Sequence, residues 1–142
     1  MRPIDEIIVH CSATEAGQNF KAADIKKWQT APPPKGNGWK DIGYHYVIDL
    51  DGTIEVGRPI DQAGAHTSNH NKTTIGICYV GGLLNGKPKD TRTLKQQAAM
   101  VQLIRSLKVC FPSIKKVSGH RDYANKACPC FDAGAAYSQY IK

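Results

Sequence analysis

The segment between residues 118 and 132 holds the side chains of this chain that are best suited to metal chemistry. It places His120, Lys126, Cys128 and Cys130 within eleven residues. Imidazole and thiolate groups are the usual protein ligands of zinc, and a lysine between them offers a cation for a developing oxyanion. The spacing does not match the paired C-x-x-C or H-x3-H knuckles of a zinc finger. A catalytic zinc site here therefore needs a further ligand from elsewhere in the chain.

A candidate for that ligand is His10, at the end of a short apolar run. Residues 4–10 predict a buried strand, because isoleucine and valine favour a covered, pleated surface. Alternation along a strand assigns its side chains to two faces: Glu6, Ile8 and His10 on one, and Ile7, Val9 and Cys11 on the other. We expect Cys11 to face the core and His10 to open onto a site at the strand end. A lone histidine there is also common as a simple hydrogen-bonding residue, so His10 alone does not identify a metal site.

The rest of the chain alternates strands and helices. Strands are predicted at residues 43–50 and 53–56, joined by an Asp51-Gly52 turn, and at residues 74–80 and 115–118. Helices are predicted at residues 22–30, from a cap at Thr91 or Thr93 to about Val109, and from Asp132 through Tyr140. We expect the middle helix to bury a stripe made of Leu94, Ala98, Val101, Ile104 and Leu107. This order predicts an α/β fold, a single domain of residues 1–142 with a central mixed β-sheet flanked by helices.

Two further segments could contribute to a site at the strand ends. Tyr44 opens the predicted hairpin. A tyrosine there is most often a core residue, and its phenol matters for chemistry only if His10 lies beside it. Residues 64–71 form a polar loop with two histidines, His66 and His70, which could line a cleft or simply connect two strands. Cys78 lies inside a strand that is apolar on both faces, so we expect a buried, unreactive thiol.

The charge balance limits the classes of partner. The net charge is +7, which suits a polyanion such as nucleic acid, anionic lipid or the anionic polymers of a bacterial cell wall. The positive charges are scattered, with no run longer than a lysine pair, so an ordinary solvated surface is an equally good interpretation. The chain lacks the clustered basic helix or aromatic platform of a nucleic-acid binder. No nucleic acid is therefore required for its function.

Cysteine usage and the terminal segment suggest where the protein is made. Five cysteines at irregular spacings argue against a disulfide framework and favour a reducing compartment or metal binding. The first five residues lack the apolar stretch of a signal peptide, and the longest apolar run is too short to span a membrane. We therefore expect a cytoplasmic protein without a transmembrane segment.

Several segments together resemble the zinc-dependent N-acetylmuramoyl-L-alanine amidases of the phage lysozyme type, a superfamily that includes the peptidoglycan recognition proteins. They follow the family's order over nearly the whole chain: residues 8–14, 39–45, 51–53, 64–66, 71–82 and 119–132. The resemblance implies zinc-dependent hydrolysis of the amide bond between N-acetylmuramic acid and L-alanine in bacterial peptidoglycan. It also implies a phage or prophage lysis enzyme that stays in the cytoplasm until it is released to the cell wall, and we expect it to be a monomer.

The resemblance also assigns roles to individual residues. His10, His120 and Cys128 match the zinc ligands of the family. Tyr44 matches a tyrosine that forms hydrogen bonds in the catalytic centre, and Lys126 matches the lysine two residues before the ligand cysteine. His66 falls on a segment of the family's substrate cleft.

The chain departs from the family pattern at Cys130, where a small polar residue is expected. Pro129 favours an extended Cys128, and in an extended chain Lys126 shares a side with Cys128, so it could place its ammonium beside a metal held there. Cys130 is followed by Phe131, which we expect to pack into the core. We therefore interpret Cys130 as a thiol that is either buried or packed beside the metal ligands, and not as a ligand itself.

Three other functions compete with the zinc amidase. A cysteine amidase could use Cys128 or Cys130 as its nucleophile with His120 as the base. A wall-recognition module without catalysis would share the fold, although receptors of this superfamily that bind without cutting often lack the cysteine ligand. A nucleic-acid binder would use the net charge alone.

Overall fold

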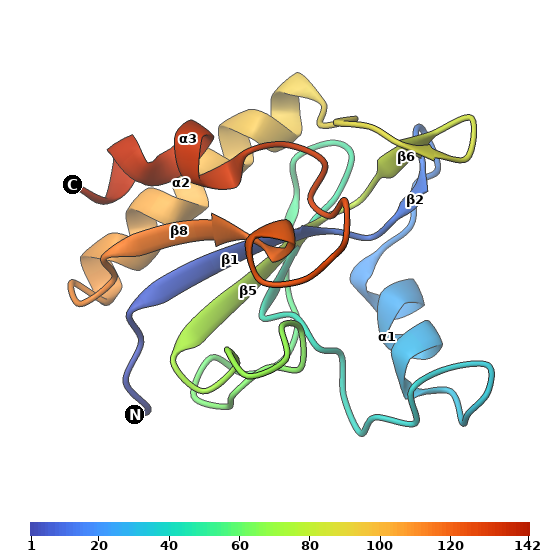
Figure 1. The fold of residues 1–142 in the computed structure, drawn as a ribbon, viewed down its shortest axis with the longest axis horizontal. Helices are drawn as coiled ribbons and strands as arrows, with labels where there is room; N and C mark the ends of the chain where they lie inside the picture. Colours follow the sequence, from blue (N-terminus) through green and yellow to red (C-terminus); the bar gives the residue numbers. More distant parts are fainter.

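The computed structural model describes residues 1–142 and contains two β-sheets and three α-helices (Figure 1). The strands are β1 (Glu6–Cys11), β2 (Thr14–Glu15), β3 (Tyr46–Ile48), β4 (Ile54–Val56), β5 (Thr74–Tyr79), β6 (Gly82–Leu84), β7 (Lys87–Pro88) and β8 (Lys116–Gly119). The α-helices are α1 (Ala22–Thr30), α2 (Leu94–Cys110) and α3 (Ala133–Tyr137). Two short 3-10 helices, η1 (His120–Asp122) and η2 (Ser138–Ile141), follow β8 and α3.

The main sheet has five strands in the order β4-β3-β5-β1-β8. Strand β1 is parallel to both of its neighbours, β5 and β8, whereas β3 and β4 form an antiparallel hairpin. The sheet is therefore mixed, which confirms the predicted fold class. Because β1 and β8 run side by side in the same direction, residues that follow their carboxyl ends meet at one edge of the sheet.

The two faces of this sheet have different coverings. Ile7, Val9 and Cys11 of β1 point to one face, where Ile77 and Tyr79 of β5 join them in a core packed against α2 and α3. Figure 1 shows these two helices side by side, with α1 at the other end of the molecule. A smaller core on the opposite face joins Ile25 of α1 to residues of β3 and β5, including Cys78. The remaining part of this second face carries His10, as alternation along β1 predicts.

Helix α2 begins as predicted and buries part of the predicted stripe, Ile104 and Leu107, with Val101 packed against the core. Thr93 caps it, accepting a hydrogen bond from the backbone N–H of Gln96, whose side chain in turn accepts from the Thr93 N–H. The prediction for Leu94 and Ala98 is wrong, since both are exposed, Leu94 by 83%. The buried residues are Gln96, Ala99, Met100, Leu103, Ile104 and Leu107. The buried Gln96 amide donates to the carbonyls of Ile48 and Val80. These hydrogen bonds direct Gln96, a polar residue of the first helical turn, toward the sheet.

Other predicted elements are present with small differences. Helix α1 has the predicted bounds, the Asp51-Gly52 turn joins β3 to β4, and Asp132 caps α3. The last helix ends at Tyr137 and continues as η2. The small sheet β2-β6-β7 was not predicted, because strands of two or three residues carry no measurable periodicity. None of the helices combines the length and the apolar character that crossing a membrane requires.

Candidate metal centre and substrate cleft

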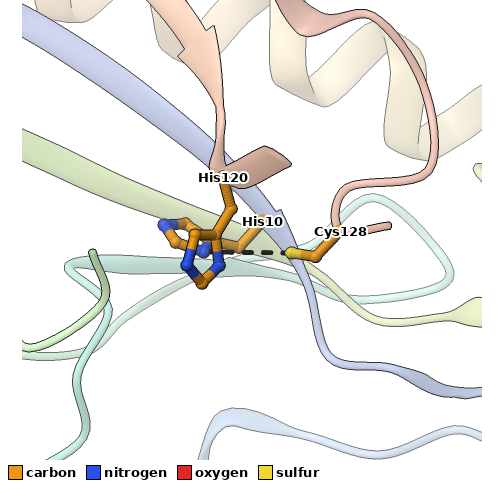
Figure 2. A group of neighbouring side chains, drawn as sticks. All are labelled: His10, His120 and Cys128. Atoms are coloured by element: carbon orange, nitrogen blue, oxygen red, sulfur yellow. Dashed lines mark hydrogen bonds between the residues drawn. The ribbon is translucent and has the colours of Figure 1, made fainter. Parts of the chain in front are cut away.

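Three predicted ligands come together at the carboxyl end of β1. The ligand atoms of His10, His120 and Cys128 all lie within 4.8 Å of one another. His10 lies on β1, His120 begins η1 directly after β8, and Cys128 lies in the loop before α3. Figure 2 shows the three side chains converging, with the Cys128 Sγ atom 3.9 Å from the His10 Nδ1 atom. The parallel pairing of β1 with β8 brings the two histidines together, with ring centroids 4.7 Å apart.

The second ring nitrogen of His10 is held by the polar loop that precedes β5. His10 Nε2 lies 2.9 Å from His66 Nδ1, and the Thr67 hydroxyl lies 3.0 Å from that same His66 atom. This arrangement leaves His10 Nδ1 free to face His120 and Cys128. Gly76 of β5 makes room for the His66 ring, because a Cβ at this position would lie 2.6 Å from it.

Electrostatics keep these imidazoles neutral. Burial, reinforced by the nearby His66, His120 and Lys126, holds the pKa of His10 well below its ordinary value. Burial and then Lys126 lower the pKa of His120. Burial lowers the pKa of His66 to about 3. Neutral rings keep the nitrogen lone pairs that a metal ion needs.

The Cys128 thiol has a hydrogen-bond donor directed at it. The backbone N–H of Cys11 donates to Cys128 Sγ at 3.2 Å. This hydrogen bond holds the sulfur atom beside the His10 Nδ1 atom. A cysteine binds metals as the thiolate.

A cleft of about 390 Å³ opens beside this group. It is lined by three of the predicted residues, His66, His120 and Lys126. Lys126 is exposed, so its ammonium reaches solvent at the rim of the cleft. The polar loop also contributes Thr67 and Asn71. Of the two interpretations of this loop, the one in which it lines a cleft is therefore confirmed.

Tyr44 lies beside His10, which was the condition for a chemical role. Its ring centroid is 5.1 Å from that of His10, at an interplanar angle of 50°. Burial raises the pKa of Tyr44 well above its ordinary value, so the phenol keeps its proton at neutral pH. Tyr44 packs beside His10 and is not among the residues that line the cleft.

The structure adds site residues that sequence reasoning missed. Trp39 and Tyr123 line the cleft. Tyr123 donates a 2.6 Å hydrogen bond to the buried Glu6 carboxylate, which also accepts from Ser118, and its ring stacks on His70 at 3.9 Å. Strand alternation had placed Glu6 on the His10 face, but nothing in the sequence linked it to a tyrosine 117 residues away.

The two thiols of the Cys-Pro-Cys segment point to different places. Cys130 has a φ of 73°, in the left-handed region, so the segment is not extended through Cys130. Cys130 Sγ donates to the carbonyl of Gly82 at 3.4 Å. Phe131 is buried in the main core, as predicted. Of the two thiols, the one grouped with His10 and His120 is Cys128.

Comparisons with known proteins agree in sequence and fold. The profile of a family described as N-acetylmuramoyl-L-alanine amidase matches residues 1–131. The endolysin of Klebsiella phage KP32 is 41% identical over 128 residues, which are 89% of this chain and 81% of that protein. The structure of the N-acetylmuramoyl-L-alanine amidase LysC from Clostridium intestinale aligns with a TM-score of 0.73 at 27% identity, over 90% of this chain and 77% of that one. Drosophila PGRP-LB aligns with a TM-score of 0.75 at 25% identity, over 98% of this chain and 80% of that one.

Proposed function

This chain belongs to the N-acetylmuramoyl-L-alanine amidase family, and we propose that it catalyses peptidoglycan hydrolysis with a zinc ion held by His10, His120 and Cys128. Family membership makes it an N-acetylmuramoyl-L-alanine amidase, and its phage relatives are endolysins. The observation that carries the zinc proposal is the convergence of two imidazole nitrogens and one thiol within 4.8 Å.

The donor set fits zinc chemically. Zinc accepts imidazole nitrogen and thiolate sulfur, and catalytic sites use three protein ligands with one position left open. A ligand histidine usually has its second nitrogen fixed by a hydrogen bond, as His10 has with His66. The cleft beside His120 gives a substrate access to the open position.

A bound zinc ion would act as a Lewis acid that lowers the pKa of water to about 7 and polarises the amide carbonyl. The other contributions come from this chain. Lys126, at the cleft rim, stabilises the negative charge that develops on the carbonyl oxygen. Tyr44 keeps its phenolic proton and orients the attacking water or relays its proton. His66 holds His10 in place and forms part of the cleft wall that contacts substrate.

The substrate is the amide between the lactyl group of N-acetylmuramic acid and L-alanine. Residues 1–142 act as a single amidase domain, and the protein works as a monomer released to the bacterial cell wall. The net charge of +7 favours binding to anionic wall polymers. This attraction should weaken with salt, because exposed charges are screened beyond about 10 Å at 0.1 M ionic strength.

Digestion of purified peptidoglycan tests the proposal. The expected products are stem peptides with new N-terminal L-alanine and no new reducing sugar ends. Chelation should abolish their release, and added zinc should restore it. New reducing ends would show glycan cleavage and contradict the amidase assignment. Full activity after strong chelation would favour a cysteine nucleophile, Cys128 or Cys130, with His120 as the base.

A further inference from the structure

A row of three side chains lies at the amino end of the sheet face that carries His10. Parallel pairing places Thr74 of β5, Glu6 of β1 and Lys116 of β8 at the same level across three adjacent strands. Side chains at matched positions of paired strands point to the same face. Each of the three forms a hydrogen bond with a segment that borders the cleft, so the row holds together two segments that are far apart in the sequence.

Tyr123 and His70 are the two ring residues that this row holds. The Tyr123 hydroxyl donates to the Glu6 carboxylate at 2.6 Å and accepts from the Lys116 ammonium at 3.0 Å. The Thr74 hydroxyl donates to the backbone carbonyl of His70 at 2.6 Å. The two rings stack, with centroids 3.9 Å apart and planes inclined by 25°. The stack therefore joins the segment after β8 to the polar loop before β5.

This stack lies between the cleft and a second hollow. Tyr123 lines the cleft, whereas His70 lines a hollow of about 490 Å³ formed by residues 69–73. Asn71 lines both, so the two hollows adjoin. The Tyr123 ring is therefore a part of the cleft wall whose position is fixed twice, by its hydroxyl and by the His70 ring.

The contacts of Tyr123 decide what it can offer a substrate. Its hydroxyl is shared between Glu6 and Lys116, and one face of its ring is covered by His70. The surface that it presents to the cleft is therefore the remaining apolar part of the ring. Such a surface packs well against the C–H face of a sugar ring. A peptide backbone, by contrast, needs hydrogen-bond partners for its amide groups.

Lys126 indicates which part of the substrate lies beside this ring. Lys126 and Tyr123 are three residues apart in one segment, and both line the cleft, as does Ala124 between them. In the proposed function, Lys126 stabilises charge on the carbonyl oxygen of the scissile amide. That carbonyl belongs to the lactyl group, which is attached directly to the ring of N-acetylmuramic acid. The sugar ring therefore lies close to the segment that carries Tyr123.

We propose that Tyr123 is a specificity-determining residue that packs against the sugar ring of N-acetylmuramic acid, and that Glu6 is the positioning residue that holds it there. The proposal rests on the proposed function, because the place of the sugar follows from the carbonyl beside Lys126. Glu6 suits a positioning role: it is 9% exposed, it does not line the cleft, and its carboxylate accepts a second hydrogen bond from Ser118.

Binding of the two reaction products tests the sugar contact without turnover. The probes are N-acetylmuramic acid and a stem peptide with a free N-terminal L-alanine, each titrated into the purified protein and followed by NMR. We expect Tyr123→Ala to raise the Kd of the sugar by about 10-fold or more and to leave the Kd of the peptide unchanged. Tyr140→Ala, which replaces a partly buried tyrosine of η2 that does not line the cleft, should change neither.

Kinetics on a muramyl peptide test the positioning by Glu6. Tyr123→Phe keeps the ring and loses the hydrogen bonds to Glu6 and Lys116, so it should raise KM while kcat stays near the wild-type value. The same peptide acylated by a lactyl group without the sugar should show no such rise. Glu6→Gln can still accept both hydrogen bonds through its amide oxygen, so it should keep the wild-type KM.

The sugar contact is overturned if N-acetylmuramic acid binds Tyr123→Ala as it binds the wild type, or if sugar and peptide lose affinity equally. An unchanged KM in Tyr123→Phe on the muramyl peptide would contradict the positioning role of Glu6. Zinc content and turnover of the lactyl peptide distinguish these results from failure of the proposed function, because both report on the metal centre and neither involves the sugar.

Discussion

His10 Nε2 lies 2.9 Å from His66 Nδ1, and this contact leaves the other nitrogen of His10 facing Cys128. His66 also lines the cleft, so it connects the ligand set to the substrate cleft. Partners of this kind fix the orientation and the tautomer of a ligand histidine.

Replacement of His66 should therefore weaken metal binding as well as turnover. We expect His66→Ala to lower zinc affinity by about 10- to 100-fold, measured by competition with a chelating dye. His70→Ala is the matched control, because His70 lies on the same loop but stacks on Tyr123 instead of contacting His10. Unchanged zinc affinity in His66→Ala would show that His66 only lines the cleft and does not support metal binding.

Lys126 acts on the transition state in our account and binds no metal. Lys126→Ala should keep the fold and its zinc, whereas kcat should fall by about 10²- to 10³-fold, the usual effect of losing one oxyanion donor. Lys35→Ala, an exposed lysine in the loop after α1, should leave turnover unchanged. Wild-type kcat in Lys126→Ala would remove the lysine from the mechanism.

Tyr44 offers a second test of a role without metal ligation. Tyr44→Phe keeps the ring that packs beside His10 and removes only the phenolic proton, which burial retains at neutral pH. We expect retained zinc and a kcat lower by about 10²-fold. Tyr46→Phe, on β3 and packed against the main core, is the control and should keep wild-type kcat. Equal activity of the two variants would make Tyr44 a packing residue.

A buried carboxyl outside the site makes stability depend on pH. Asp49 is 2% exposed, and burial together with the neighbouring Glu55 raises its pKa to about 6 against the opposing effect of Lys21. The folded state therefore holds this proton more tightly than the unfolded chain. The stabilising contribution is complete below about pH 3.8 and is lost as the pH rises through about 6.

Asp49→Asn should remove this decrease in the free energy of unfolding with rising pH. Denaturant unfolding measured from pH 4 to pH 7 should give a free energy of unfolding that decreases less with pH in the variant than in the wild type. Asp51→Asn controls for the local loss of charge. Hydrogen bonds from Thr53 lower the pKa of Asp51 from 3.8, so its contribution is present throughout this range and its removal should leave the decrease between pH 4 and pH 7 in place. If the free energy of unfolding changed with pH in the same way in the wild type and in Asp49→Asn, the raised pKa of Asp49 would be contradicted.

Local patterns predicted the elements that position the ligands. Alternation from Glu6 to Cys11 assigned both faces of β1, because a central strand buried on both faces has little freedom of register. The resemblance supplied the ligand set before any geometry was known, and the structure groups the same three residues.

Other features depended on contacts that no local pattern contains. The Glu6–Tyr123 hydrogen bond joins residues from opposite ends of the chain. Cys130 has a φ of 73°, a conformation that no local pattern predicted, and its thiol donates to the Gly82 carbonyl and is not part of the group with His10 and His120. The buried Gln96 of α2 is a polar residue whose partners, the carbonyls of Ile48 and Val80, exist only in the assembled sheet.

The zinc stoichiometry of two variants, each with one cysteine replaced, tests the central claim most directly. The wild type and Cys130→Ser should each retain about one zinc per chain after dialysis, whereas Cys128→Ser should retain far less, because Cys128 is the thiol grouped with His10 and His120. Elemental analysis of the three purified proteins at equal concentration provides the measurement. Loss of zinc from Cys130→Ser with retention in Cys128→Ser would show that the ligand assignment is wrong.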